Sequence, residues 1–304
     1  MVSISTIICL APREQSLAQT TQERLGYSAN ARLLVIHADD FGETHSVNRA
    51  IIEALEKGWV TSASVMVPCP WFPEVVRFVK EHPNVDLGVH LTLTSEWQDL
   101  RWGPVAPRDQ VPSLLDADGY LPLTATAVTG NAAPADVETE LRAQFERAQK
   151  MGIHATHLDS HMGALLGSKP LFKIYVKMGH AYGLPVLGQP GNYADVLPAR
   201  ETLIDGVIEI EPGVAAQDWM EWYERRLANL GPGVYQLTVH LAYEDAEMLG
   251  ATRDHPGWGA VWRQRDLDLL GNPRFQEFLR RQGFALVKWR ELARALPEEY
   301  LNKR

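Results

Sequence analysis

From residue 32 onward, short apolar runs rich in β-branched residues alternate with segments of helical spacing. The run Arg32-Leu-Leu-Val-Ile-His37 predicts a buried strand, and the apolar stripe from Val47 to Leu55, which stops at Gly58, predicts the helix that follows it. Further strands are expected at 61–67, 85–93, 154–158, 184–187, 206–210, 234–241 and 284–287, and further helices at 72–81, 135–151, 171–182, 217–230, 273–282 and 290–296. This alternation predicts an α/β fold, a barrel-like (β/α) domain of about seven parallel strands.

Residues 31–304 contain no linker rich in Pro and Gly, so we expect one domain there. Within it, residues 95–134 lack sustained periodicity and form a long insertion, and such loops usually carry function or move. Residues 1–30 are an N-terminal extension or a signal segment. An apolar stretch at 2–11 and a suitable cleavage site at 16–18 favour export, whereas the absence of Lys or Arg before that stretch disfavours it. Cytoplasmic and exported locations both stay open.

Composition excludes several classes of protein. The 38 acidic residues outnumber the 29 basic ones, which leaves no broad cationic surface for nucleic acid and suits an uncharged or cationic small substrate. Two cysteines, Cys9 and Cys69, are too few for a disulfide framework or a thiolate zinc site. No apolar run reaches the roughly 18 residues of a membrane-spanning helix. The oligomeric state stays open, with a homo-oligomer as one option.

Histidine and aspartate residues collect where the predicted strands end. The first strand runs into His37-Ala-Asp39-Asp40, and later strands carry His90, Asp159-Ser-His161 and His240. Parallel α/β folds place their active sites at this edge of the sheet. The chain has only ten histidines, so their placement on separate strand ends predicts one shared pocket.

Two imidazoles and one carboxylate from different strands can hold a divalent ion and leave positions open for water and substrate, as in hydrolytic sites. Two adjacent aspartates cannot both point the same way from an extended backbone, so one is expected to hold the ion while the other faces the attacking water as a base. Each feature also has an ordinary structural explanation, because paired acids often begin a helix and lone histidines are often buried side chains. His157 and His161 are four residues apart, but their segment reads as strand and loop, so helical pairing is not expected.

Three ordered motifs resemble the YdjC-like carbohydrate deacetylase family, which includes the chitooligosaccharide deacetylases. They are His37-Ala-Asp-Asp-Phe-Gly42 with Asn48 and Gly58-x-Val-Thr-Ser62 behind it, then Gly88-Val-His90, then Thr156-His-Leu-Asp-Ser-His161, and the resemblance spans about 32–295. It implies a distorted (β/α) barrel related to polysaccharide deacetylases and a catalytic domain that removes an N-acetyl group from an acetylated amino sugar or oligosaccharide.

The same resemblance implies a role for each matched residue. Asp40, His90 and His161 would hold the metal, Asp39 would be the general base, and His240, in the strand Gln236-Leu-Thr-Val-His240, would be the acid that protonates the leaving amine. Zinc is our first expectation, with magnesium or another divalent ion as an alternative. The family commonly continues from Asp-Ser-His with further histidines, whereas Met162-Gly-Ala-Leu-Leu follows here, so substrate contacts on this loop are expected to differ.

Aromatic side chains after strand ends are the natural surface for a sugar ring. Trp97, Trp102, Tyr243 and Trp258 are the candidates, and Tyr243 has the best position in the sequence. Arg253, Asp254 and His255 lie in a loop after the His240 strand, where they either line the pocket or face solvent.

Two other function classes are compatible with this fold. A metal-dependent phosphoesterase or sugar isomerase would use similar ligands, but no Arg or Lys adjoins Asp39, His90 or His161 in the sequence to bind phosphate. A non-catalytic carbohydrate-binding protein has no need for a base such as Asp39.

Overall fold

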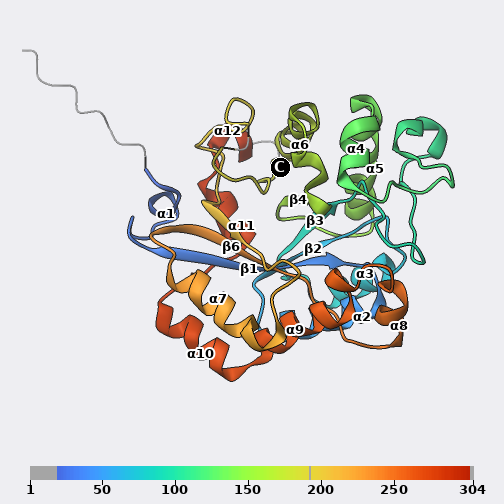
Figure 1. Ribbon diagram of the computed structural model, residues 1–304. Helices are drawn as coiled ribbons and strands as arrows, with labels where there is room; N and C mark the ends of the chain where they lie inside the picture. The colour runs from blue at the N-terminus through green and yellow to red at the C-terminus, as the bar shows by residue number, and fades with distance from the viewer. Residues whose placement is uncertain (1–18, 192, 302–304) are drawn as a thin grey trace, which may run out of the picture.

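The computed structural model describes residues 19–191 and 193–301. Seven parallel strands form one curled sheet in the order β4-β3-β2-β1-β6-β5, and β7 pairs with the start of β1 (Figure 1). The strands are β1 (Arg32–Phe41), β2 (Ser62–Val65), β3 (Leu87–Leu91), β4 (Leu158–Ser160), β5 (Gly206–Ile208), β6 (Gly233–Val239) and β7 (Ala285–Leu286). Because β4 and β5 are the ends of this order, strand pairing leaves the described barrel open. The predicted α/β fold, a distorted barrel of parallel strands, is confirmed.

Helices lie on both sides of the sheet in Figure 1, with α2, α3 and α7–α10 below it and α4–α6, α11 and α12 above it. They are α1 (Thr21–Arg24), α2 (His45–Glu56), α3 (Phe72–Glu81), α4 (Ala125–Asn131), α5 (Pro134–Lys150), α6 (Lys169–Tyr182), α7 (Trp219–Ala228), α8 (Ala246–Ala251), α9 (Ala260–Gly271), α10 (Pro273–Gln282), α11 (Trp289–Leu292) and α12 (Glu298–Leu301). Short 3-10 turns lie at Arg108–Gln110, Pro112–Leu114, His161–Leu166, Ala216–Asp218, Pro256–Trp258 and Ala293–Ala295. None of the helices in the described ranges is both long and apolar enough to cross a bilayer.

Two expected strands differ from the structure. The segment 184–187 contributes only a single bridge, between Val186 and Leu158, and not a strand. The strand expected at 154–158 instead begins at Leu158 and includes Asp159. This shift matters because it places Asp159 beside His90 of β3 in the pairing register.

Helix α9 was not expected from the sequence. Apolar residues cover most of its circumference, and Arg263 and Asp266 are also buried on it. Because these apolar residues are spread around the helix, it lacks the one-sided apolar stripe by which helices are recognised.

The two faces of β1 have different environments. Leu34, Ile36 and Ala38 pack into the large core between sheet and helices. Leu33 and Val35 point the other way, into a smaller apolar cluster with Trp289 that fills the inside of the curl near the amino ends of the strands. Side chains alternate along a strand, so His37 follows on this inner face. The inside of the curl is therefore apolar at one end and polar at the carboxyl end.

Part of the expected N-terminal extension packs on the domain. Residues 1–18, with Cys9 and the apolar stretch 2–11, lie outside the described residues. Thr20 caps α1, and the Arg24 guanidinium donates hydrogen bonds to the carbonyls of Arg200 and Ala295. Cys69 is buried as a free thiol.

The insertion 95–134 is ordered by buried acceptors. The Glu140 carboxylate on α5 accepts hydrogen bonds from the backbone N–H groups of Val105 and Ala106, at 2.9 and 2.8 Å. Asp136 accepts from Ser113 N at 2.9 Å, and Arg101 pairs with Asp116 at 2.7 Å. This segment therefore packs against α5 beside the sheet.

Candidate active site

A bulge in β1 brings two neighbouring carboxylates to the same place. The pairing of β1 with β2 shifts register between Ala38 and Phe41, and Asp40 has a left-handed φ of 67°. Asp39 Oδ2 and Asp40 Oδ1 lie 3.9 and 3.5 Å from the same atom, Nε2 of His90. The expectation that the two aspartates point apart is therefore wrong, because the backbone is not extended at Asp40. A non-glycine residue in this conformation costs of order 1–3 kcal/mol, and such strain is concentrated at functional sites.

Asp40, His90 and His161 meet in a tight group. Asp40 Oδ1 lies 3.2 Å from His161 Nδ1 and 3.5 Å from His90 Nε2, and the two nitrogens are 3.3 Å apart. All three residues are buried. Asp40 Oδ1 finds no hydrogen-bond donor of good geometry in the described part of the chain. The three residues can hold a metal ion, and they come from β1, β3 and the turn after β4.

A carboxylate lies behind each imidazole. His90 Nδ1 is 2.8 Å from Asp159 Oδ1, and His161 Nε2 is 3.0 Å from Glu96 Oε2. Such outer carboxylates orient the ring and direct its other nitrogen toward a metal. Burial by itself lowers the pKa of His161, but the Glu96 and Asp40 carboxylates outweigh burial and raise the pKa to about 9. The sequence analysis assigned no role to Glu96 or Asp159, although Asp159 lies inside the motif that ends at His161.

The other oxygen of Asp40 is held by a buried guanidinium. Arg263 Nη1 on α9 lies 2.7 Å from Asp40 Oδ2 and 3.5 Å from Glu43 Oε2. Burial tends to raise the pKa of Asp40, but the charge of Arg263 and the two adjacent imidazoles, His161 and His90, hold it well below its usual range. Arg263 is engaged with two carboxylates, so it is not free to bind a phosphate.

Replacing Arg263 by Ala is expected to destabilise the fold strongly. Removal of one partner of a buried ion pair leaves an uncompensated charge and typically costs about 3–5 kcal/mol. Urea unfolding of R263A checks this value, with Arg265→Ala on the same helix as the control, because Arg265 stacks over Trp219 and is only partly buried. A loss no larger than that of R265A would contradict the importance of the Arg263 pair.

Asp39 lies beside this group without belonging to it. Its Oδ1 is 3.0 Å from His37 Nε2 and 3.4 Å from Ser64 Oγ, and its Oδ2 is 4.0 Å from His240 Nε2. The Asp39 side chain keeps 13% of its surface exposed, against 2% for Asp40. Asp39 is therefore the more accessible of the two carboxylates.

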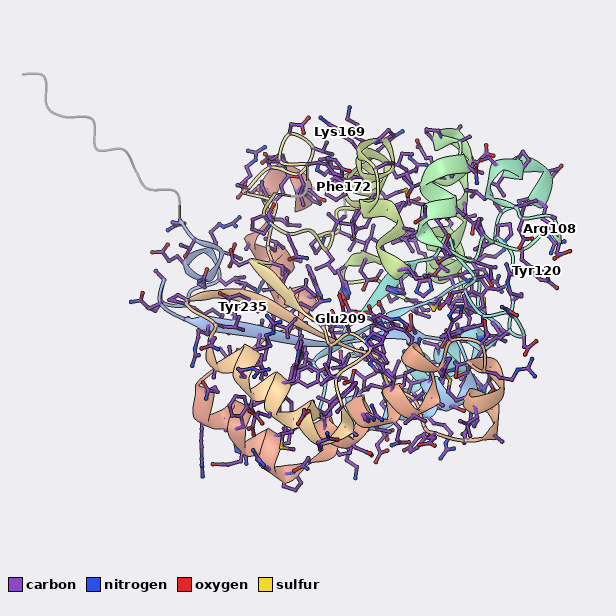
Figure 2. The ribbon with its side chains drawn as sticks, in the orientation of Figure 1. Arg108, Tyr120, Lys169, Phe172, Glu209 and Tyr235 are labelled. Carbon is purple, nitrogen blue, oxygen red and sulfur yellow. The ribbon has the colours of Figure 1, made fainter. Side chains whose placement is uncertain are left out.

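His240 follows β6 and lies next to a glutamate that the sequence analysis missed. Its Nε2 is 3.7 Å from Glu209 Oε1 and 4.0 Å from Asp40 Oδ2. Burial lowers the pKa of His240 to about 4, although Asp40 and Asp39 oppose the change. Partial burial beside the acidic cluster, together with the charges of Asp39 and Asp40, raises the pKa of Glu209 to about 8. Figure 2 shows Glu209 near the middle of the molecule, at the carboxyl end of β5. The sequence offered one signal for Glu209, which is its position near the end of the strand expected at 206–210.

The residues expected to contact substrate lie in different places. Trp258 is 38% exposed, and its ring centroid lies 6.2 Å from that of His240. Trp97 is 1% exposed and donates from Nε1 to Glu43 Oε1 at 2.6 Å, so it supports the site from behind and offers no open face to a sugar. Trp102 is also buried, with its Nε1 donating to the Thr94 carbonyl. The prediction that Trp97 and Trp102 offer a surface to the sugar is therefore wrong, because both indoles face the interior.

Tyr243 and Arg253 have their contacts outside the central cluster. The Tyr243 hydroxyl bonds to Glu53 on α2, and Arg49 stacks over its ring. Arg253 is 75% exposed and pairs with Asp99 of the insertion. In the same loop, Asp254 accepts from Gln98 N at 3.2 Å, so this loop and the start of the insertion are joined by two contacts.

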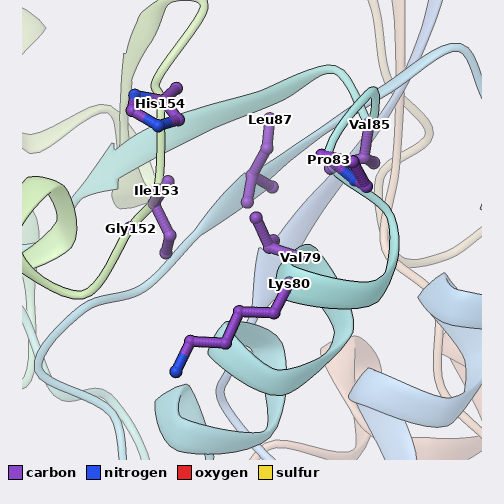
Figure 3. A pocket seen from close by; sticks show the side chains of 8 residues that line it. All are labelled: Val79, Lys80, Pro83, Val85, Leu87, Gly152, Ile153 and His154. Atoms are coloured by element: carbon purple, nitrogen blue, oxygen red, sulfur yellow. The ribbon is translucent and has the colours of Figure 1, made fainter.

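A separate small cavity of about 150 Å³ lies away from these residues (Figure 3). It is lined by Val79 and Lys80 of α3, by Pro83, Val85 and Leu87, and by residues 152–154. Leu87 begins β3, whereas His90 is near its end, so this cavity is at the amino end of the strands. Within the described residues, the group of Asp40, His90 and His161 lies at the opposite, carboxyl end of the strands.

The chain is similar to known proteins over most of its length. A family model described as YdjC-like protein matches residues 33–281. A carbohydrate deacetylase of Thermus thermophilus is 34% identical over 285 residues, which are 90% of this chain and 98% of that protein. A carbohydrate deacetylase of Thermoanaerobacter pseudethanolicus is 25% identical over 85% of this chain and 98% of its own length.

A solved structure has the same fold. It is a protein of Enterococcus faecalis, provisionally described as a cellobiose-phosphate cleavage protein, with a TM-score of 0.72 and 26% identity over 86% of this chain and 99% of that one. With the family model matching most of the chain and a relative similar over nearly its full length, this chain belongs to the YdjC-like protein family.

Proposed function

We propose that this protein is a divalent-metal-dependent deacetylase that hydrolyses the N-acetyl group of an acetylated amino sugar or oligosaccharide. The observation that carries the proposal is the buried Asp40 Oδ1, which has no well-placed donor among residues 19–191 and 193–301 and faces two imidazole nitrogens. Two relatives that are known as carbohydrate deacetylases suggest the substrate class.

The donor atoms fit a small divalent cation. Ligand atoms around a tetrahedral zinc ion lie about 3.3 Å apart, given metal–ligand bonds of about 2.0–2.1 Å, and the separations among Asp40 Oδ1, His90 Nε2 and His161 Nδ1 are 3.2–3.5 Å. Nitrogen ligands favour zinc over magnesium, so zinc is the first candidate. When bound, such an ion supplies Lewis acidity toward water and the acetyl carbonyl oxygen.

Asp39 is the proposed general base. Its Oδ2 lies 3.9 Å from His90 Nε2, so it borders the position that the ligand atoms surround. Its other oxygen is held by His37 and Ser64, which fixes the direction of the free oxygen. A carboxylate placed in this way can accept a proton from the attacking water.

His240 is the proposed proton donor to the leaving amine, and it must first take up a proton. With a pKa lowered to about 4 by burial, the resting imidazole is neutral and not protonated. Its Nε2 lies 4.0 Å from Asp39 Oδ2, so we propose that the proton taken up by Asp39 passes to Nε2 and then to the amine nitrogen. The water proton thus leaves with the amino sugar, and acetate is the second product.

His240→Ala is expected to slow poor leaving groups most. An aliphatic amine needs a proton to depart, so its hydrolysis should fall about 10²- to 10⁴-fold. An activated aryl ester such as p-nitrophenyl acetate needs no acid and should lose much less. Steady-state rates for both substrates measure the difference, and an equal loss for the two would refute the acid role.

Trp258 is the aromatic residue that we propose for stacking against the sugar, because it is partly exposed next to His240. An aromatic face binds the apolar side of a pyranose ring. Glu209, which is 39% exposed beside Nε2 of His240, would face the region of the amine product.

Acetate release from N-acetylated chitooligosaccharides tests the function. Purified protein is assayed as isolated, after chelation and after zinc is restored. Release that stops with the chelator and returns with zinc supports the proposal. Phosphate release from sugar phosphates, isomerised sugar, or binding of the glycan without acetate would favour the other function classes. No release with any acetylated sugar would overturn the deacetylase assignment.

A further inference from the structure

His37 lies between two carboxylates of the central cluster, and the mechanism above uses only its contact with Asp39. Its Nε2 is 3.0 Å from Asp39 Oδ1, 3.0 Å from Asp159 Oδ2 and 3.1 Å from Ser64 Oγ. The side chain is completely buried. A single nitrogen therefore contacts two acids that come from different strands, β1 and β4.

The network joins the proposed base to a proposed ligand. Asp159 uses Oδ2 for His37 and Oδ1 for His90 Nδ1, at 2.8 Å. The order is thus Asp39, His37, Asp159, His90. We propose that His37 is a positioning residue that acts as a cationic clamp between Asp39 and Asp159 and holds the base at a fixed place beside His90. This inference rests on the proposed function, because it takes Asp39 as the base.

The electrostatic surroundings agree with a charged His37. Burial alone lowers its pKa, but the adjacent carboxylates of Asp159 and Asp39 raise the pKa to about 9. The other titratable neighbour is His157, whose ring lies 5.0 Å away, edge to face, and stacks on Trp289. Burial and the charge of His37 lower the pKa of His157 to about 4, so this neighbour stays neutral. The imidazolium of His37 thus offsets one of the two negative charges of Asp39 and Asp159.

A competing explanation uses the same atoms. His37, His157 and Asp159 also form a group that could hold a cation. A second ion there would require a neutral His37 with its lone pair on the metal, whereas the clamp requires a proton on Nε2. The two explanations therefore predict different protonation states and different metal stoichiometries.

The experiment uses His37→Leu, which removes the donor and the charge, and His37→Gln, which keeps a neutral donor near the position of Nε2. His157→Gln is the matched control, since it removes a buried imidazole of the same layer that lies no closer than 3.9 Å to Asp159. Thermal midpoints of all variants separate loss of fold from loss of the clamp. The expected result for His37→Leu is a kcat about 10- to 100-fold lower with KM changed less than about threefold, the range that outer-shell contacts produce. His37→Gln should recover part of kcat, and His157→Gln should retain most of it.

Two readouts do not depend on turnover. In the metal-free wild-type protein, the ring ¹⁵N shifts of His37 at pH 7 should be those of an imidazolium, and Asp159→Asn should lower the pH at which the ring titrates. Zinc titration should give one equivalent for the wild type and for both His37 variants. A neutral His37 ring, a wild-type kcat in His37→Leu, or a second zinc equivalent lost with His37 would each overturn the clamp. If no acetylated sugar is hydrolysed, the proposed function fails, while the NMR and zinc results still decide the state of His37.

Discussion

Asp39→Asn is expected to lower kcat for an N-acetylated oligosaccharide by about 10²- to 10⁴-fold, the usual contribution of a general base. The amide keeps the size of the side chain and can still contact His37 and Ser64, which lie 3.0 and 3.4 Å from Oδ1. It cannot take a proton from water at neutral pH. Steady-state kinetics at saturating metal measure the loss.

Metal content is the control for this variant. Asp39 lies outside the Asp40, His90 and His161 group, so D39N should keep the zinc stoichiometry of the wild type by elemental analysis. Full deacetylase activity in a metal-loaded D39N protein would remove the base assignment. Loss of zinc together with activity would instead make Asp39 a ligand.

His90→Ala and His161→Ala are expected to lose the bound metal and, with it, activity down to the level of the chelated wild type. In the proposed site each imidazole would supply one of three protein ligands, and each is fixed from behind by a carboxylate, Asp159 or Glu96. Two remaining ligands cannot hold zinc tightly in competition with water. Elemental analysis after gel filtration and acetate release measure the two effects.

His154→Ala is the matched control for these ligand variants. His154 is an exposed histidine near the amino end of the strands, beside the cavity of Figure 3. It should keep both metal and activity. A stoichiometric metal ion in H90A or H161A would show that the ion is bound elsewhere.

The course of the strands could largely be predicted from local patterns. Apolar runs of β-branched residues mark β1 and β6, and their ends carry Asp39, Asp40 and His240. The same reasoning found His90 and His161, because residues at the carboxyl ends of parallel strands must come close together. It also placed α3 and α10, whose apolar residues follow a one-sided helical stripe.

Contacts made across the fold could not be predicted in this way. Arg263 lies 223 residues from Asp40 and on a helix without an apolar stripe, so neither its helix nor its partner has a local signal. Glu96 belongs to an insertion without periodicity, and Glu209 follows a strand of only three residues. The sequence also could not distinguish the buried aromatic candidates from the exposed one. Only packing decides that Trp97 faces inward and Trp258 outward.

The amino-acid sequence alone determined which elements form and which polar residues stand at their ends, because hydrophobic periodicity and strand propensity act over a few neighbouring residues. Only the tertiary structure decided how those polar residues are used. The bulge at Asp40 turns two adjacent carboxylates to the same site, and the burial of His37, Asp159 and Arg263 among them sets which groups carry charge. Distances of about 3 Å between residues remote in the chain result from packing of the whole sheet, and electrostatic energies in a dry interior depend on those distances.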